Sequence, residues 1–126
     1  MIVKRVLCPE RVRRIPERFS WVDHRLVRDH HIERCGVEAL ALYLLLVTVG
    51  DAEGLSYYSD AAVARLLSLD EAGVGRARRA LLAARLIAYR APLYQVLSLD
   101  RSPGATPRAN RCLSLGEILR SARGEA

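Results

Sequence analysis

Residues 59–99 decide the fold of this chain, and they read SDAAVARLLSLDEAGVGRARRALLAARLIAYRAPLYQVLSL. The first half of this segment predicts two helices with a tight turn between them, over 60–67 and about 69–84. Ser59 is a typical N-cap for the first helix. The pattern Ser68-Leu-Asp-Glu71 is typical of a capping box, which predicts that a new helix begins there.

The helix predicted over 69–84 has one apolar face. Its inward positions recur at intervals of three and four residues, and they are Val74, Ala77, Leu81 and Ala84. The arginines outside this stripe are expected to face solvent, and they are Arg76, Arg78, Arg79 and Arg85. Gly73 and Gly75 weaken the start of this helix. They indicate either an imperfect helix start, which we favour, or a backbone that comes close to a phosphate.

A hairpin is predicted after this helix, because the β-prone runs 86–90 and 93–99 flank a tight turn at Ala91-Pro92. Upstream, a helix is expected over about 37–50 and a short strand over 55–58. That strand would complete a small sheet with the hairpin. Tyrosines are then expected to pair across the sheet, namely Tyr57 or Tyr58 with Tyr89 and Tyr94.

The helix predicted over 37–50 is apolar on nearly all sides. One stripe at helical spacing consists of Val37, Leu40, Ala41, Leu44, Leu45 and Thr48. A second stripe consists of Leu42, Leu46 and Val49. Such a helix must be covered on nearly all sides, either by the N-terminal arm or by a second copy of the chain. Together with the amphipathic helix expected near the C-terminal end of the sequence, this helix indicates a homodimer, which would match two DNA half-sites.

The two ends of the chain differ from its middle. Residues 1–19 form an Arg-rich arm with Pro9 and Pro16, and the arm is expected to contain a short strand over 2–7. A short helix with Ser20 as its cap is expected to follow, to about His31, with Leu26 and Val27 inward and Arg25 and Arg28 outward. A polar loop over 100–111 and a short amphipathic helix capped by Ser114 complete the chain. The organisation is thus an arm with a short helix (1–35), a central domain (36–99) and a C-terminal extension (100–126), in one compact domain.

The order helix, strand, helix, turn, helix, hairpin is typical of a winged helix. The stretch Ala64-Arg-Leu-Leu-Ser-Leu…Val74…Arg78-Arg-Ala-Leu81…Leu86-Ile87 resembles the helix-turn-helix and wing entry of bacterial winged-helix DNA-binding proteins, DnaD-like and replication-initiator domains among them. More weakly, residues 21–60 resemble small proteins carried near bacterial mobile elements. The expected fold is therefore α+β and mainly helical: a three-helix core, a short strand and a β-hairpin wing. That family usually has Gly before Leu86; here Arg85 either adopts the left-handed conformation or the helix ends differently.

The resemblance implies binding of double-stranded DNA, in transcription regulation or in initiating the replication or mobility of an element. By resemblance, the exposed face of the helix over 69–84 enters the major groove, which indicates Arg76 and Arg79 first and then Arg78. Arg90 at the wing tip is expected to meet a phosphate or the minor groove. The basic arm offers further contacts along the DNA backbone or in the minor groove, from Arg11, Arg13, Arg14 and Arg18. Each arginine either reads guanine or holds a phosphate.

Charge is distributed unevenly along the chain, whose net charge is +6. Residues 1–34 carry nine basic and five acidic groups, residues 35–75 one and six, and residues 76–126 ten and three. Basic blocks beside an acidic block favour a polyanion as partner. Asp70 and Glu71 oppose this at the helix start, because they repel phosphates placed there. The alternative is a winged-helix adaptor that does not bind DNA, whose acidic 35–75 face or C-terminal helix docks a replication or transposition protein.

Other functional classes find little support in the sequence. No phosphate-binding loop, dinucleotide fingerprint or nucleophile elbow is present, so we expect no enzyme and no cofactor. His24, His30, His31 and Cys35 include one pair at helical spacing, but nothing completes a metal site, and we expect no metal. Cys8 and Cys112 are expected to be buried thiols. No apolar run is long enough to span a membrane, and no signal peptide is evident, so we expect a cytoplasmic protein.

Overall fold

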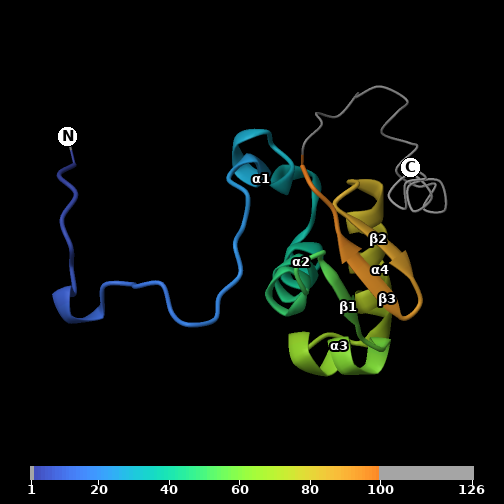
Figure 1. Ribbon diagram of the computed structural model, residues 1–126. Helices are drawn as coiled ribbons and strands as arrows, with labels where there is room; N and C mark the ends of the chain where they lie inside the picture. Colours follow the sequence, from blue (N-terminus) through green and yellow to red (C-terminus); the bar gives the residue numbers. More distant parts are fainter. Residues whose placement is uncertain (1, 100–126) are drawn as a thin grey trace, which may run out of the picture.

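The computed structural model describes residues 2–99, which form an α+β structure of helices and a three-stranded antiparallel sheet (Figure 1). Two 3₁₀ turns, Pro9–Arg11 and Ile32–Arg34, accompany the helices and strands. In chain order these elements are α1 (Arg25–Arg28), α2 (Val37–Val49), β1 (Leu55–Tyr57), α3 (Asp60–Leu67), α4 (Glu71–Ala83), β2 (Ile87–Arg90) and β3 (Leu93–Val96). The predicted loop over 100–111, the helix after Ser114 and Cys112 lie outside the described residues.

The starts of α3 and α4 follow local capping chemistry. The Ser59 hydroxyl accepts a hydrogen bond from the Ala62 amide at 3.1 Å, as the sequence predicted. At α4 the cap is Asp70, whose Oδ1 accepts from the Gly73 amide at 2.7 Å. The predicted capping box starting at Ser68 is therefore wrong. Ser68 instead ends α3, and the carboxylate two residues later takes the capping role, as Asp commonly does.

The ends of α3 and α4 share one device, a residue in the left-handed conformation. Ser68 has φ 58° after α3, and Arg85 has φ 63° after α4. After α4 the Leu86 amide donates to the Leu81 carbonyl and the Arg85 amide to the Leu82 carbonyl, both at 3.0 Å. This is the Schellman arrangement, which satisfies carbonyls at the helix end. Of the two alternatives that the sequence left for Arg85, the left-handed one is correct.

The sheet has the order β1-β3-β2, so the last strand of the hairpin lies in the middle. Tyr89 on β2 lies opposite Tyr94 on β3, and their ring centroids are 4.6 Å apart, which confirms that pair. On the other side of β3, Ser56 rather than a tyrosine lies opposite Tyr94. Tyr57 lies opposite Leu93 and is exposed.

The core lies between α2, α3, α4 and the sheet. Every predicted inward residue of α4 is buried, from Val74 to Ala84. The expectation that α2 is covered on nearly all sides is not met within one chain. Leu42 and Leu46 of the second stripe are buried, but Val37 and Leu44 of the first stripe are 84% and 62% exposed. The residues that α2 buries are Ala39, Leu42, Tyr43 and Leu46. Because α2 is apolar all round, its hydrophobic pattern did not determine which side would meet α4.

The N-terminal arm differs from its prediction in several ways. Residues 2–20 are all exposed, and the segment 2–7 forms no strand (Figure 1). The Ser20 hydroxyl caps no helix and donates instead to the Thr48 carbonyl at 3.2 Å. α1 begins only at Arg25, whose amide donates to Asp23 Oδ1 at 2.9 Å.

Three apolar or thiol side chains on the arm and α1 differ in their burial. Leu26 is buried as predicted, because it packs into the core cluster. Val27 and Cys8 were predicted to be inward and buried, and both are exposed because the arm and α1 meet little of the body.

Within residues 2–99 no helix is both long and apolar enough to cross a membrane.

Candidate nucleic-acid interface

The surface of α4 opposite its core face is a narrow stripe. The residues exposed at intervals of three and four along it are Ala72, Arg76, Arg79 and Ala83. Alanines at both ends keep the helix slim, so its backbone and its two arginines could come close to a flat or grooved partner. Two of the arginines predicted to contact DNA, Arg76 and Arg79, therefore share one face.

Arg78 does not belong to this stripe. Its guanidinium donates to Asp60 Oδ1 at 2.7 Å and Oδ2 at 3.2 Å, and to the Tyr94 hydroxyl at 3.0 Å. It also lies 4.4 Å from the centre of the Tyr89 ring. Only 16% of the Arg78 side chain is exposed. The prediction that Arg78 faces solvent is wrong, because the first residue of α3 and the hairpin tyrosines hold it.

The contacts of Arg78 also change the acid–base behaviour of this cluster. The hydrogen bonds to Asp60 raise the pKa of Arg78 above its usual value. Burial raises the pKa of the Tyr94 phenol, and the nearby Arg78 works in the opposite direction. The group therefore links α3, α4 and both hairpin strands through a fixed positive charge.

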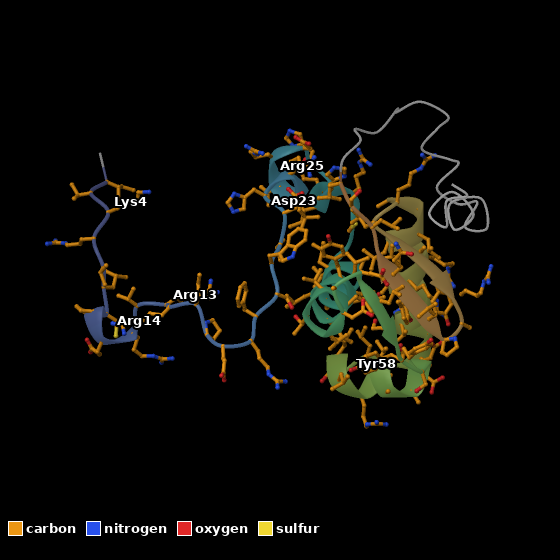
Figure 2. The ribbon with its side chains drawn as sticks, in the orientation of Figure 1. Lys4, Arg13, Arg14, Asp23, Arg25 and Tyr58 are labelled. Carbon is orange, nitrogen blue, oxygen red and sulfur yellow. The ribbon has the colours of Figure 1, made fainter. Side chains whose placement is uncertain are left out.

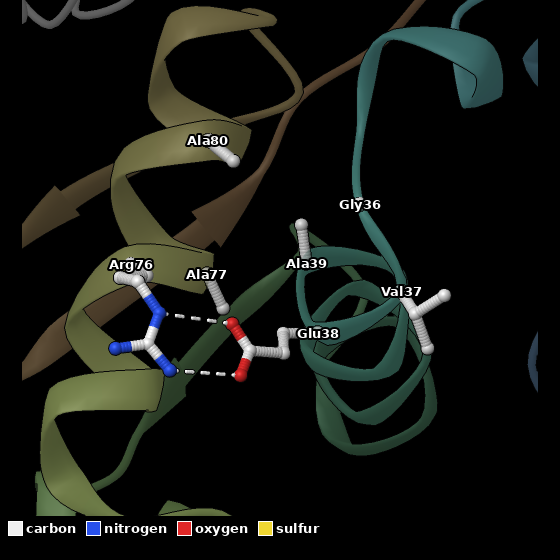
Figure 3. Close-up of a pocket in the computed structure, with 7 residues that line it drawn as sticks. All are labelled: Gly36, Val37, Glu38, Ala39, Arg76, Ala77 and Ala80. Carbon is white, nitrogen blue, oxygen red and sulfur yellow. Dashed lines mark hydrogen bonds and ion pairs between the residues drawn. The ribbon is translucent and has the colours of Figure 1, made fainter.

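Arg76 is exposed but paired. Its Nη2 donates to Glu38 Oε2 at 3.0 Å and its Nε to Oε1 at 3.2 Å, which joins α4 to the first turn of α2 (Figure 3). The pair borders an open hollow of about 400 Å³ between the two helices, also lined by Gly36, Val37, Ala39, Ala77 and Ala80. Glu38 raises the pKa of Arg76. Much of the Arg76 charge is therefore balanced at close range.

The two glycines of α4 have distinct surroundings. A Cβ at Gly73 would lie 2.9 Å from Asp70 Oδ1 and 3.3 Å from Arg76 Nη2, so Gly73 makes room for the helix cap and the ion pair. A Cβ at Gly75 would meet only Arg79 Nη1, at 3.4 Å. Local packing accounts for Gly73, and a folded-back Arg79 side chain lies against Gly75.

Arg90 and the arm supply the remaining predicted cations. Arg90 is exposed at the end of β2, directly before the hairpin turn. Figure 2 shows Arg13 and Arg14 on the extended arm, away from the body. Residues 2–20 carry six basic and two acidic groups, whereas residues 21–99 carry nine of each. The net positive charge of the described chain therefore lies on the arm, at a distance from α4.

The histidine and cysteine cluster does not assemble into a ligand set. His30 Nδ1 lies 2.7 Å from Glu33 Oε2, which raises the pKa of His30. His31 is buried with neither ring nitrogen hydrogen-bonded, and Cys35 Sγ lies 3.9 Å from the His31 carbonyl. Burial raises the pKa of the Cys35 thiol, so it is a poor nucleophile. Across residues 2–99, no three His, Cys, Asp or Glu side chains gather as a metal site would require.

The two carboxylates that form ion pairs with arginines of α4, which are Glu38 and Asp60, were not identified from the sequence. Both Asp60 and Glu38 were counted as charges of the acidic block 35–75, and Asp60 also as part of a helix start. A signal did exist, since both acids stand in the first turns of helices expected to pack against α4.

Comparison of the chain with models of known families, with characterised proteins and with solved structures gives no match.

Proposed function

We propose that this chain is a winged-helix module that binds double-stranded DNA in the cytoplasm, with α4 as its recognition helix and the β2–β3 hairpin as a short wing. The observation that carries the proposal is the exposed stripe of α4, which has two arginines between alanines on the side away from the core. The element order and the central place of β3 are compatible with a winged helix. The role we propose is transcription regulation or the initiation of replication or mobility of an element.

The proposed contacts are narrower than the sequence alone suggested. Arg79 and Arg90 are exposed on α4 and the hairpin, and Arg76 joins them when DNA phosphates compete with Glu38. Arg13 and Arg14 contact the DNA backbone from the arm. Arg78 has a structural role, because its donors already face Asp60 and Tyr94.

The test is a fluorescence anisotropy titration of the full chain with mixed-sequence duplex DNA between about 50 and 200 mM salt. Each arginine–phosphate contact contributes about 0.9 to the slope of log K against log salt. Replacing Arg79 or Arg90 by glutamine should therefore lower the slope by about one. Arg28→Gln is the matched control, because Arg28 is exposed on α1.

Glu38→Gln is expected to tighten binding several-fold, because it removes the carboxylate that balances Arg76. Absence of salt-dependent binding by the unaltered chain would refute the proposal. That result would favour the alternative, a winged-helix adaptor for another protein of replication or transposition. The observation that favours this alternative is the charge of residues 21–99, where nine basic and nine acidic residues cancel.

A further inference from the structure

The structure leaves two apolar surfaces of this chain open to solvent at once. The first is the outer face of α2, which consists of Val37, Leu40, Ala41, Leu44 and Thr48. Val37 and Leu44 on this face are 84% and 62% exposed. The second is the arm, residues 2–20, whose exposed large hydrophobic residues are Ile2, Val3, Val6, Leu7, Val12, Ile15 and Phe19.

We propose that two copies of this chain exchange arms, so that the arm of each copy packs along the outer face of α2 of the other. Within one chain the arm runs away from the body (Figure 1), and the Ser20 hydroxyl at its end donates a hydrogen bond to the Thr48 carbonyl of α2. The arm is stiffened by Pro9 and Pro16, since proline fixes φ. It is therefore presented outward, where a second copy can meet it.

The dimensions and areas fit such an exchange. The outer face of α2 runs along a helix of 13 residues, which is about 20 Å long. An extended segment of the length of the arm reaches roughly 60 Å, so it can cross from one body and cover this face. About six extended residues span this face, so each arm can place two or three of its apolar side chains on it. The two arm–face contacts together then bury on the order of 1,000 Å², which is near the lower limit for specific interfaces.

Charge also favours this occupant. The arm carries six basic groups against two acidic ones. Two exposed acids, Asp51 and Glu53, follow directly after the C-terminal end of α2. A basic apolar arm is thus complementary to an apolar face with one acidic end.

The test is sedimentation velocity of the full chain without nucleic acid, so its outcome is independent of DNA binding. The arm variant is Ile15→Asp with Phe19→Asp, and the face variant is Leu44→Asp. Leu66→Asp is the matched control, because Leu66 is equally exposed but lies on α3. The unaltered chain and the control are expected to dimerise, and the arm and face variants to bind about 100-fold more weakly, as for the loss of buried anchors.

The decisive measurement is a mixture of the arm variant and the face variant. In the heterodimer the intact arm of the face variant packs on the intact face of the arm variant, whereas each variant alone has both contacts damaged. The mixture should therefore dimerise more tightly than either variant alone. A monomeric unaltered chain overturns the proposal. So does loss of the dimer in the face variant only, which indicates direct α2–α2 packing. Absence of the heterodimer also overturns it, because the arm of one copy then does not contact the α2 face of the other.

Discussion

Replacing Arg78 by methionine is expected to destabilise the fold, although Arg78 lies on a helix whose other arginines are exposed. Methionine keeps most of the packing volume but removes the two hydrogen bonds to Asp60 and the one to Tyr94. Hydrogen bonds to charged groups contribute about 1.5–3 kcal/mol, and the contact with the Tyr89 ring adds about 0.5–1 kcal/mol. The Asp60 side chain is 34% exposed, so water replaces part of the loss. The expected decrease in the free energy of unfolding is therefore about 2–3 kcal/mol.

The assay is urea unfolding followed by far-UV circular dichroism, with a thermal scan beside it. The midpoint temperature should fall by roughly 10–20 °C for a folded unit of this size. Arg79→Met is the matched control, because Arg79 is exposed on the next position of α4, and it should change stability by less than about 0.5 kcal/mol. A double-mutant cycle with Asp60→Asn isolates the pair. Equal stability of the Arg78 and Arg79 variants would refute the reasoning.

Three further predictions concern single sites. Arg85→Gly should stabilise the fold by about 1 kcal/mol in urea unfolding, because glycine adopts a positive φ without strain; a destabilised variant would contradict this. Gly75→Ala should raise stability by about 0.5–1 kcal/mol through helix propensity, whereas Gly73→Ala, whose Cβ would crowd the helix cap, should lower it; the same sign for both is the contrary result. The pKa of Asp23 is lowered to about 2 by hydrogen bonds from Arg25. Its contribution to stability is therefore present above pH about 4 and is lost as the pH falls towards 2. Carboxyl NMR of the folded chain should show the pKa of Asp23 at about 2, and NMR of the unfolded chain should show it near its usual value.

Much of α3 and α4 was predictable because local chemistry and burial agree there. Residues 60–67 begin after a serine cap, and the stripe from Val74 to Ala84 is apolar on one side only. The Arg85 position was identified through the resemblance to winged-helix proteins, which usually have Gly directly before the residue that corresponds to Leu86. In such segments one face of the helix is apolar and the other is polar, so the spacing of the apolar residues identifies the buried side.

The rest depended on contacts between distant segments. α2 has apolar residues on every side, so its orientation followed from packing against α4 rather than from its own pattern. The ion-pair partners of the arginines were equally unpredictable from the sequence. Arg76 pairs with Glu38 and stays exposed, whereas Arg78 pairs with Asp60 and is largely buried. Side-chain hydrogen bonds across the fold, such as Ser20 to Thr48, have no signature in a single sequence.

The central position of β3 has a consequence for synthesis of this chain on the ribosome. Among the strands of residues 2–99, β1 pairs with β3 alone, and β3 is made last of the three. While α3 and α4 emerge, the backbone groups of β1 that later bond β3 face water or any other strand they meet. The nascent chain therefore closes its sheet in one late step, after Val96 has left the exit tunnel, and a chain stalled before Leu93 would carry an open edge that invites aggregation.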